Sequence, residues 1–192
     1  MRQAGFTLTE LLVVMAIVAI LLGIGVPSYR YITNSYRMSS EVNGLLGDLQ
    51  FARGEAIKEG QPVTACVSRD GATCDLGSVT WQEGWIVFQD PNNNQTVDPG
   101  EAVLRVQAGF TGTDTFVANN GVNSVTFNRE GFATAGGGGV PIPFPSATVT
   151  LHEQTANAAW TRCLYITPTG AMSTETPASL AVALNAPAGS CT

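Results

Sequence analysis

The chain opens with an almost uninterrupted apolar run. The 21 residues from Phe6 to Val26 contain a single ionisable side chain, Glu10. At about 1.5 Å of rise per residue, a helix of this length spans the roughly 30 Å hydrocarbon core of a membrane. The pattern therefore predicts a membrane-spanning helix over residues 6–27.

After this run the apolar positions become periodic. They recur at alternating steps of four and three, which marks one face of a helix: Met38, Val42, Leu45, Leu49, Ala52 and Ala56. Gly60 and Pro62 are helix-ending residues, so we expect the helix to continue to about Glu59. The second half of the helix is thus predicted to be amphipathic.

Gly23, Gly25 and Pro27 are the weakest point of the predicted helix. Glycine costs about 1 kcal/mol and proline about 3 kcal/mol in a helix interior. We therefore expect a kink or a melted turn at these residues.

Beyond Gly60 the period changes to two, and β-branched and aromatic residues become frequent, which is typical of strands. The expected strands are 62–68, 79–89, 102–107, 115–118, 124–128, 147–152 and 162–167, with short pieces near Phe132 and Met172. Trp81, Trp85 and Phe88 fit an alternating strand as core residues better than as a binding surface. The predicted fold class is α+β, with a long N-terminal helix packed on an antiparallel β-rich globular head.

Composition favours one soluble domain after the membrane segment. Of 192 residues, 9 are Lys or Arg and 15 are Asp or Glu, giving a net charge of −6. Subtracting Arg2 and Glu10 leaves 8 basic and 14 acidic residues after Pro27. A domain this acidic is poorly suited to binding nucleic acid, so no nucleic-acid partner is expected.

The four cysteines are better explained by disulfides than by a metal site. Cys66, Cys74, Cys163 and Cys191 form no CxxC pair, and the sequence has one histidine, His152. Three pairings are possible, and we favour the sequence-local one, Cys66–Cys74 with Cys163–Cys191. Disulfides need an oxidising compartment, which places residues 28–192 in the periplasm.

The N-terminus resembles the class III signal of type IV pilins. The resemblance rests on Arg2 in a short leader and on Gly5 before Phe6-Thr7-Leu8, with Glu10 ahead of the apolar helix. It implies that a prepilin peptidase removes residues 1–5 by cutting between Gly5 and Phe6 and methylates the new N-terminus. It also implies that Glu10 docks subunits in the filament, which fits the cost of about 2.5–3.5 kcal/mol for an unpaired carboxylate at the centre of a membrane.

The head is similar to the GspH/FimT family. Four segments carry this similarity: 52–58, 81–90, 100–105 and 125–131. The resemblance implies a minor pilin or pseudopilin with a type IV pilin-like fold, held in the inner membrane by one span and built into a filament that it helps to initiate or cap. Its expected partners are other pilins or pseudopilins and the prepilin peptidase. Neither an enzymatic activity nor a small-molecule substrate is expected.

One loop has the oxygen spacing of a calcium-binding turn. The candidate ligands are Asp90, Asn92, Asn94, Asp98 and Glu101, at loop positions 1, 3, 5, 9 and 12. Gln95 stands where such a turn needs glycine, and the flanks are strands rather than helices. The alternative is a polar hairpin loop without a cofactor.

Two other functions remain open at this stage. Some FimT-type members bind DNA during uptake through a basic segment after a glycine, but Gly170-Ala171-Met172-Ser173 has no arginine, and no Lys or Arg follows Arg162. A membrane-anchored enzyme would need a catalytic group of residues, and none is recognisable around His152. Between a pilus and a secretion pseudopilus, the Cys163 and Cys191 pair resembles the C-terminal loop of type IV pilins and favours the pilus.

Overall fold

The structure is a computed structural model that describes residues 7–75, 77, 80–136, 147–152 and 157–176. It divides between Arg37 and Met38 into two compact units. The elements in chain order are α1 (Leu8–Glu59), β1 (Val63–Val67), the 3-10 turn η1 (Trp81–Glu83), β2 (Gly84–Gln89), β3 (Val103–Ala108), β4 (Thr115–Ala118), the 3-10 turn η2 (Asn119–Gly121), β5 (Ser124–Phe127), β6 (Ala133–Ala135), β7 (Ala147–His152), β8 (Arg162–Ile166) and β9 (Met172–Glu175).

Helix α1 ends where the sequence predicts. Its last residue is Glu59, and Gly60 takes the left-handed φ of 69° that glycine adopts readily. The backbone N–H of Gly60 donates to the carbonyl of Ala56 at 3.0 Å and closes the last turn. The expectation of a melted turn is wrong, because α1 is helical throughout, with Pro27 inside it. Proline removes one hydrogen bond, but its fixed φ is itself helical, so the flanking turns can hold the helix together.

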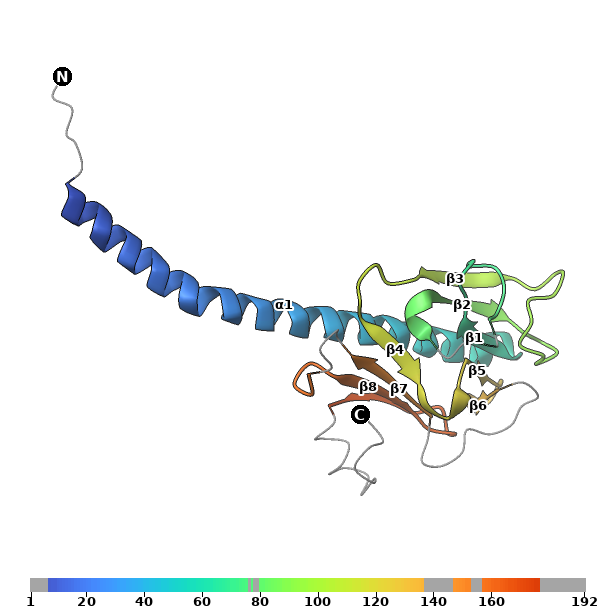
Figure 1. Cartoon of the computed structure of the whole chain (residues 1–192). Helices are drawn as coiled ribbons and strands as arrows, with labels where there is room; N and C mark the ends of the chain where they lie inside the picture. Colours follow the sequence, from blue (N-terminus) through green and yellow to red (C-terminus); the bar gives the residue numbers. More distant parts are fainter. Residues whose placement is uncertain (1–6, 76, 78–79, 137–146, 153–156, 177–192) are drawn as a thin grey trace. The chain divides into compact units, whose positions relative to one another are not determined.

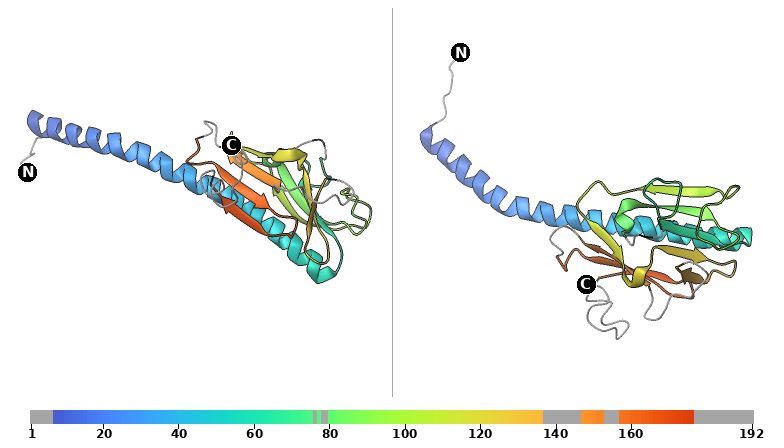
Figure 2. Two further views of the ribbon diagram at one scale, coloured as in Figure 1. Left: turned by 90° about the horizontal axis from the view of Figure 1, so that it is seen from below. Right: turned by 45° about the vertical axis from the view of Figure 1, so that its right-hand side comes forward.

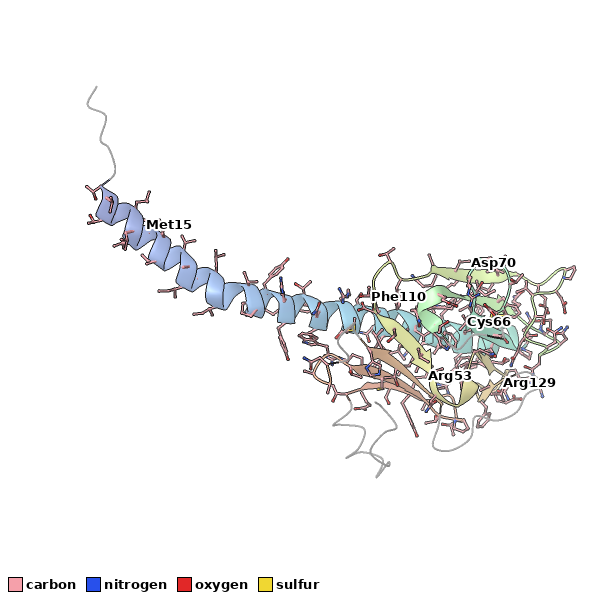
Figure 3. The ribbon with its side chains drawn as sticks, viewed as in Figure 1. Met15, Arg53, Cys66, Asp70, Phe110 and Arg129 are labelled. Atoms are coloured by element: carbon pink, nitrogen blue, oxygen red, sulfur yellow. A yellow bond between two sulfur atoms is a disulfide. The ribbon has the colours of Figure 1, made fainter. Side chains whose placement is uncertain are left out.

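The first unit contains the apolar part of α1. Its large apolar side chains are exposed, from Leu8 at 80% to Val18 at 42%, and Met15, labelled in Figure 3, is 64% exposed. Among the described residues, α1 is the one helix with the length and composition to cross a membrane, with a mean hydropathy of 2.7 over its most apolar window. These side chains lack a core within their own unit.

The second unit holds two antiparallel sheets. The strand order is β3-β2-β1-β5-β6 in the five-stranded sheet and β4-β7-β8-β9 in the four-stranded sheet. In Figure 1 and in the right-hand view of Figure 2, β3 and β8 lie on opposite sides of the cyan part of α1. This arrangement confirms the predicted fold class of a long helix packed on an antiparallel β-rich head.

One strand is shorter than the sequence predicts, because it starts at a glycine. The predicted strand over residues 79–89 begins only at Gly84, after the η1 turn. Gly84 has a φ of 109°, and a Cβ there would lie 2.6 Å from the carbonyl oxygen of Gln107. Close approach of β3 therefore requires glycine at this position, and the preceding residues form a turn instead.

The main core joins the amphipathic half of α1 to both sheets. The six α1 residues of the predicted apolar face are all buried, at 0–1% exposure: Met38, Val42, Leu45, Leu49, Ala52 and Ala56. The same core cluster includes Trp81, Trp85, Phe116 and Leu164. The prediction that Trp81 and Trp85 are core residues is confirmed.

A second, smaller cluster covers the other face of the five-stranded sheet. Cys66, Ile86 and Phe88 are fully buried there, with Cys74 and Val97 packed against them. Cys74 and Val97 belong to the loops after β1 and β2, so these two loops act as the cover that buries this face.

Candidate functional site

The N-terminal site is described from Thr7 onward. Gly5 and Phe6, the predicted cleavage and methylation residues, lie outside the described residues. Glu10 is exposed in the first turn of α1, and its backbone N–H donates to Thr7 Oγ1 at 3.2 Å. An acidic side chain is favourable at a helix N-terminus. Among the described residues, no cation pairs with the Glu10 carboxylate.

Asp90, the first candidate calcium ligand, is fully buried and already hydrogen-bonded. Its Oδ2 accepts from Thr64 Oγ1 at 2.7 Å and from the N–H of Gln95 at 3.0 Å. Its Oδ1 accepts from the N–H of Asn94, also at 3.0 Å. The carboxylate thus ties its own loop to β1, and a metal would have to displace these donors.

The remaining candidate ligands contact one another through nitrogen as well as oxygen. Asn92 and Asn94 donate through Nδ2 to Asp98 Oδ2 at 2.9 and 2.8 Å, and the N–H of Asp98 donates to Glu101 Oε2 at 2.9 Å. Across the described part of the chain, no group of three His, Cys, Asp or Glu side chains could hold a metal ion. Calcium binding stays a prediction, and the hydrogen bonds favour the hairpin alternative.

Gln95, the departure from the calcium-loop pattern, has a structural role. It adopts the left-handed φ of 59° that such a loop requires at this position. Its buried side chain accepts from Ser124 Oγ at 2.7 Å and donates to the carbonyl of Gly136. The glutamine side chain thus joins the loop to β5 and to the residues after β6.

The predicted Cys66–Cys74 disulfide is present, with the two Cα atoms 5.6 Å apart. Cys163 is buried on β8, and Cys191 lies outside the described residues, so the Cys163–Cys191 pair stays a prediction.

In the loop before Cys74, Asp70 accepts from the N–H groups of Ala72 and Thr73, each at 2.8 Å. These bonds, chiefly that from Ala72, hold the pKa of Asp70 well below its ordinary value of 3.8.

Sequence reasoning missed a junction built around Arg53, which is labelled in Figure 3. Its Nε donates to the carbonyl of Gly131 at 3.0 Å and its Nη2 to the carbonyl of Thr169 at 3.4 Å. Gly170 has to be glycine, because a Cβ there would lie 2.1 Å from the Gly131 oxygen. One α1 side chain thus joins the turns after β5 and β8. The one sequence signal for Arg53 is its place in the 52–58 segment, which carries part of the family resemblance.

Asp48 is a second missed contact between α1 and the five-stranded sheet. Its Oδ1 accepts from Arg105 Nη1 at 2.7 Å, and its Oδ2 accepts from Trp85 Nε1 at 2.9 Å. The Arg105 guanidinium also lies 3.9 Å from the centre of the Phe51 ring. This carboxylate fixes how α1 sits on β2 and β3.

The architecture of the described residues defines a class of protein. An exposed apolar helix with one acidic residue in its first turn continues into an amphipathic half that packs on two antiparallel sheets, which is the architecture of a pilin-like filament subunit. The chain belongs to the family described as type II transport protein GspH, whose model matches residues 41–170. The prokaryotic N-terminal methylation motif matches residues 1–26.

Two relatives match the chain in sequence, and one solved structure shares its fold. The chain is 33% identical over 101 residues to the pilin-like protein PilA1 of Thermus thermophilus, covering 53% of this chain and 57% of that protein. It is 31% identical over 137 residues to the type IV major fimbrial protein FimA of Dichelobacter nodosus, covering 70% and 78% respectively. The crystal structure of the type IV minor pilin FimU of Pseudomonas aeruginosa shares the fold, with a TM-score of 0.52 and 21% identity over 75% of this chain and 92% of that one.

Family membership identifies the chain as a structural subunit of the pilin and pseudopilin class, of a type IV pilus or a type II secretion system. The methylation motif and the apolar helix together indicate a membrane-anchored subunit.

Proposed function

We propose that this chain is a minor pilin-like subunit that helps to initiate or cap a type IV pilus or a type II secretion pseudopilus. The observation that carries the proposal is a methylation motif over residues 1–26, followed by an exposed apolar helix and a head of the GspH family. Residues 1–5 are the leader, 6–27 the membrane and filament-core segment and 28–192 the periplasmic head. The inner membrane, the prepilin peptidase and other pilins or pseudopilins are its partners.

Glu10 supplies the docking chemistry in this proposal. Its carboxylate is exposed on α1, and an unpaired carboxylate is costly in lipid. Cleavage after Gly5 creates an α-amino group on Phe6, and in an assembly of parallel helices that amine reaches the Glu10 of a neighbour. The charge pair forms only between subunits, so it favours assembly and leaves the fold of the head unchanged.

The proposal is tested first by the mass of the membrane form. The mature chain should begin at N-methylated Phe6. A chain that keeps residues 1–5, or one cut near Pro27, contradicts the proposal.

The second test is incorporation. Glu10→Ala should be inserted and processed normally but depleted from sheared filaments, whereas Glu130→Ala, which removes an exposed head carboxylate paired with Arg129, should be incorporated normally. Normal incorporation of Glu10→Ala would refute the docking role. Deletion of the gene should reduce filament number or secretion, and whichever is lost identifies the filament system.

A further inference from the structure

A groove runs between the last turns of α1 and the start of β9. Its volume is about 440 Å³. The residues that line it are Gln50, Arg53, Gly54 and Ile57 on the helix side, and Gly170, Ala171 and Met172 on the sheet side. The groove lies entirely within the second unit.

Arg53 brings a positive charge to this groove, and no carboxylate in the described part of the chain balances it. The two hydrogen bonds that it donates to described residues go to neutral backbone carbonyls, those of Gly131 and Thr169. Within the described residues it forms no ion pair, whereas Lys58, Arg69, Arg105 and Arg129 each have a carboxylate within 3.3 Å. A guanidinium has five N–H donors in a fixed fork, so two bonds leave donors for a ligand.

The surroundings of this cation are open and partly apolar. Ile57 is 52% exposed, and Met172 lines the opposite wall. Phe132, 51% exposed, follows Gly131 in the turn that Arg53 holds. Gly54 contributes no side chain, and a Cβ placed there would meet nothing within 4 Å. A ligand for this groove therefore needs one anionic group and flanking apolar surface.

We propose that the groove binds a carboxylate side chain, flanked by apolar residues, on a neighbouring subunit of the filament. A guanidinium matches a carboxylate in shape as well as charge. This head has 14 acidic and 8 basic residues after Pro27, so one isolated cation fits a single carboxylate better than a polyphosphate backbone, which needs several. The inference rests on the proposed function, because it names the chemistry of a subunit contact.

The test uses the full chain in nanodiscs and a fluorescent acetylated Leu-Glu-Leu tripeptide amide as the probe. The peptide should bind, and its Leu-Gln-Leu counterpart should bind at least about tenfold more weakly, because the charge-assisted hydrogen bond is lost. Arg53→Gln should weaken binding of the Glu peptide by a similar factor.

Gly54→Leu separates binding from folding. It fills the groove while leaving Arg53 and its two carbonyl partners intact, and it should raise helix stability, because glycine is a poor helix former. Gly54→Leu should weaken binding of the Glu peptide at least about tenfold. Gly44→Leu is the matched control, since it makes the same change in α1 outside the groove and also in open space, and it should leave binding within about twofold.

Three results overturn the inference: equal binding of the Glu and Gln peptides, no loss of binding in Gly54→Leu, or a single-stranded oligonucleotide that binds through Arg53 in preference to the Glu peptide. None of these alters the mass of the mature chain or the incorporation of Glu10→Ala. A wrong inference about the groove is thus distinguishable from a wrong proposed function.

Discussion

The two halves of α1 use apolar residues in opposite ways. In residues 8–26 the large apolar side chains point in all directions and are exposed, Leu12 at 62% and Ile24 at 70%. In the half from Met38 to Glu59, apolar residues form one stripe, and Leu45 and Leu49 are fully buried. A helix that is apolar all round needs a surrounding apolar environment, whereas a striped helix needs a single packing partner.

The difference shows which part of the molecule buries its apolar surface without a partner. The head buries its stripe against its own two sheets and satisfies Asp48 and Asp90 with its own donors. The first half of α1 finds neither a core nor, among the described residues, a cation for Glu10. In the proposed function, lipid before assembly and neighbouring helices in the filament would surround it.

The test with the largest expected effect makes the same leucine-to-alanine substitution in each half of α1. Leu45→Ala should lower the free energy of unfolding of the head by about 3 kcal/mol, because it leaves a cavity in the core. Leu12→Ala should change it by less than about 0.5 kcal/mol, because Leu12 has no core contacts. Denaturation of the full chain in detergent, followed by the fluorescence of buried Trp81 and Trp85, measures both.

A comparable loss in the two variants would break the comparison, since it would mean that the apolar half of α1 contributes to the stability of the head. A loss confined to Leu45→Ala would show that only the amphipathic half of α1 stabilises the head.

The next test concerns the covalent support of the head. Replacing both Cys66 and Cys74 by alanine should lower the free energy of unfolding by about 2 kcal/mol, because the bridge closes a short loop of sequence separation 8. Membrane insertion and processing should not change. Non-reducing peptide mapping checks the pairing, and Cys66 joined to Cys163 would contradict it.

The sequence predicts the structural features that depend on local chemistry or on the spacing of apolar residues. The end of α1 at Glu59 follows from Gly60 and Pro62, and the buried stripe follows from steps of three and four. The Cys66–Cys74 pair is predicted because the two residues are close in sequence. These features need no knowledge of which strands pair.

Contacts between distant residues could not be predicted in this way. Arg53 meets Gly131 across 78 positions and Thr169 across 116, and Asp48 meets Arg105 across 57. The oxygen spacing of the loop after β2 predicts calcium ligands, and it does not reveal that Thr64 on β1 donates to Asp90. That contact follows only from strand pairing, in which Thr64 lies opposite Phe88, two residues before Asp90.

A smaller effect should appear at acid pH. The N–H of Ala72, with Thr73, holds the pKa of Asp70 below its ordinary 3.8, so the ionised carboxylate favours the folded head. That contribution is complete above about pH 4 and is lost as the pH falls toward the lowered pKa of the folded state. In Asp70→Asn the melting temperature should therefore fall less than in the wild type between neutral pH and pH about 2. Equal losses in the two proteins would show that Asp70 does not act through its charge.

The smallest expected effect is that of calcium, and it asks whether the head is complete without a ligand. A cation that binds only the folded state raises its melting temperature. Asp90 already accepts three hydrogen bonds, and Asp98 accepts two from amide nitrogens, so millimolar calcium should leave the melting temperature unchanged. Asp90→Ala should destabilise the head equally with and without calcium, because the buried N–H of Gln95 loses its acceptor, and the Thr64 hydroxyl and the N–H of Asn94 each lose one of two partners. A calcium-dependent rise that magnesium does not reproduce, and that Asp90→Ala or Asp98→Asn abolishes, would instead establish the loop as a calcium site. The head would then, like the first half of α1, depend on a component from outside the chain.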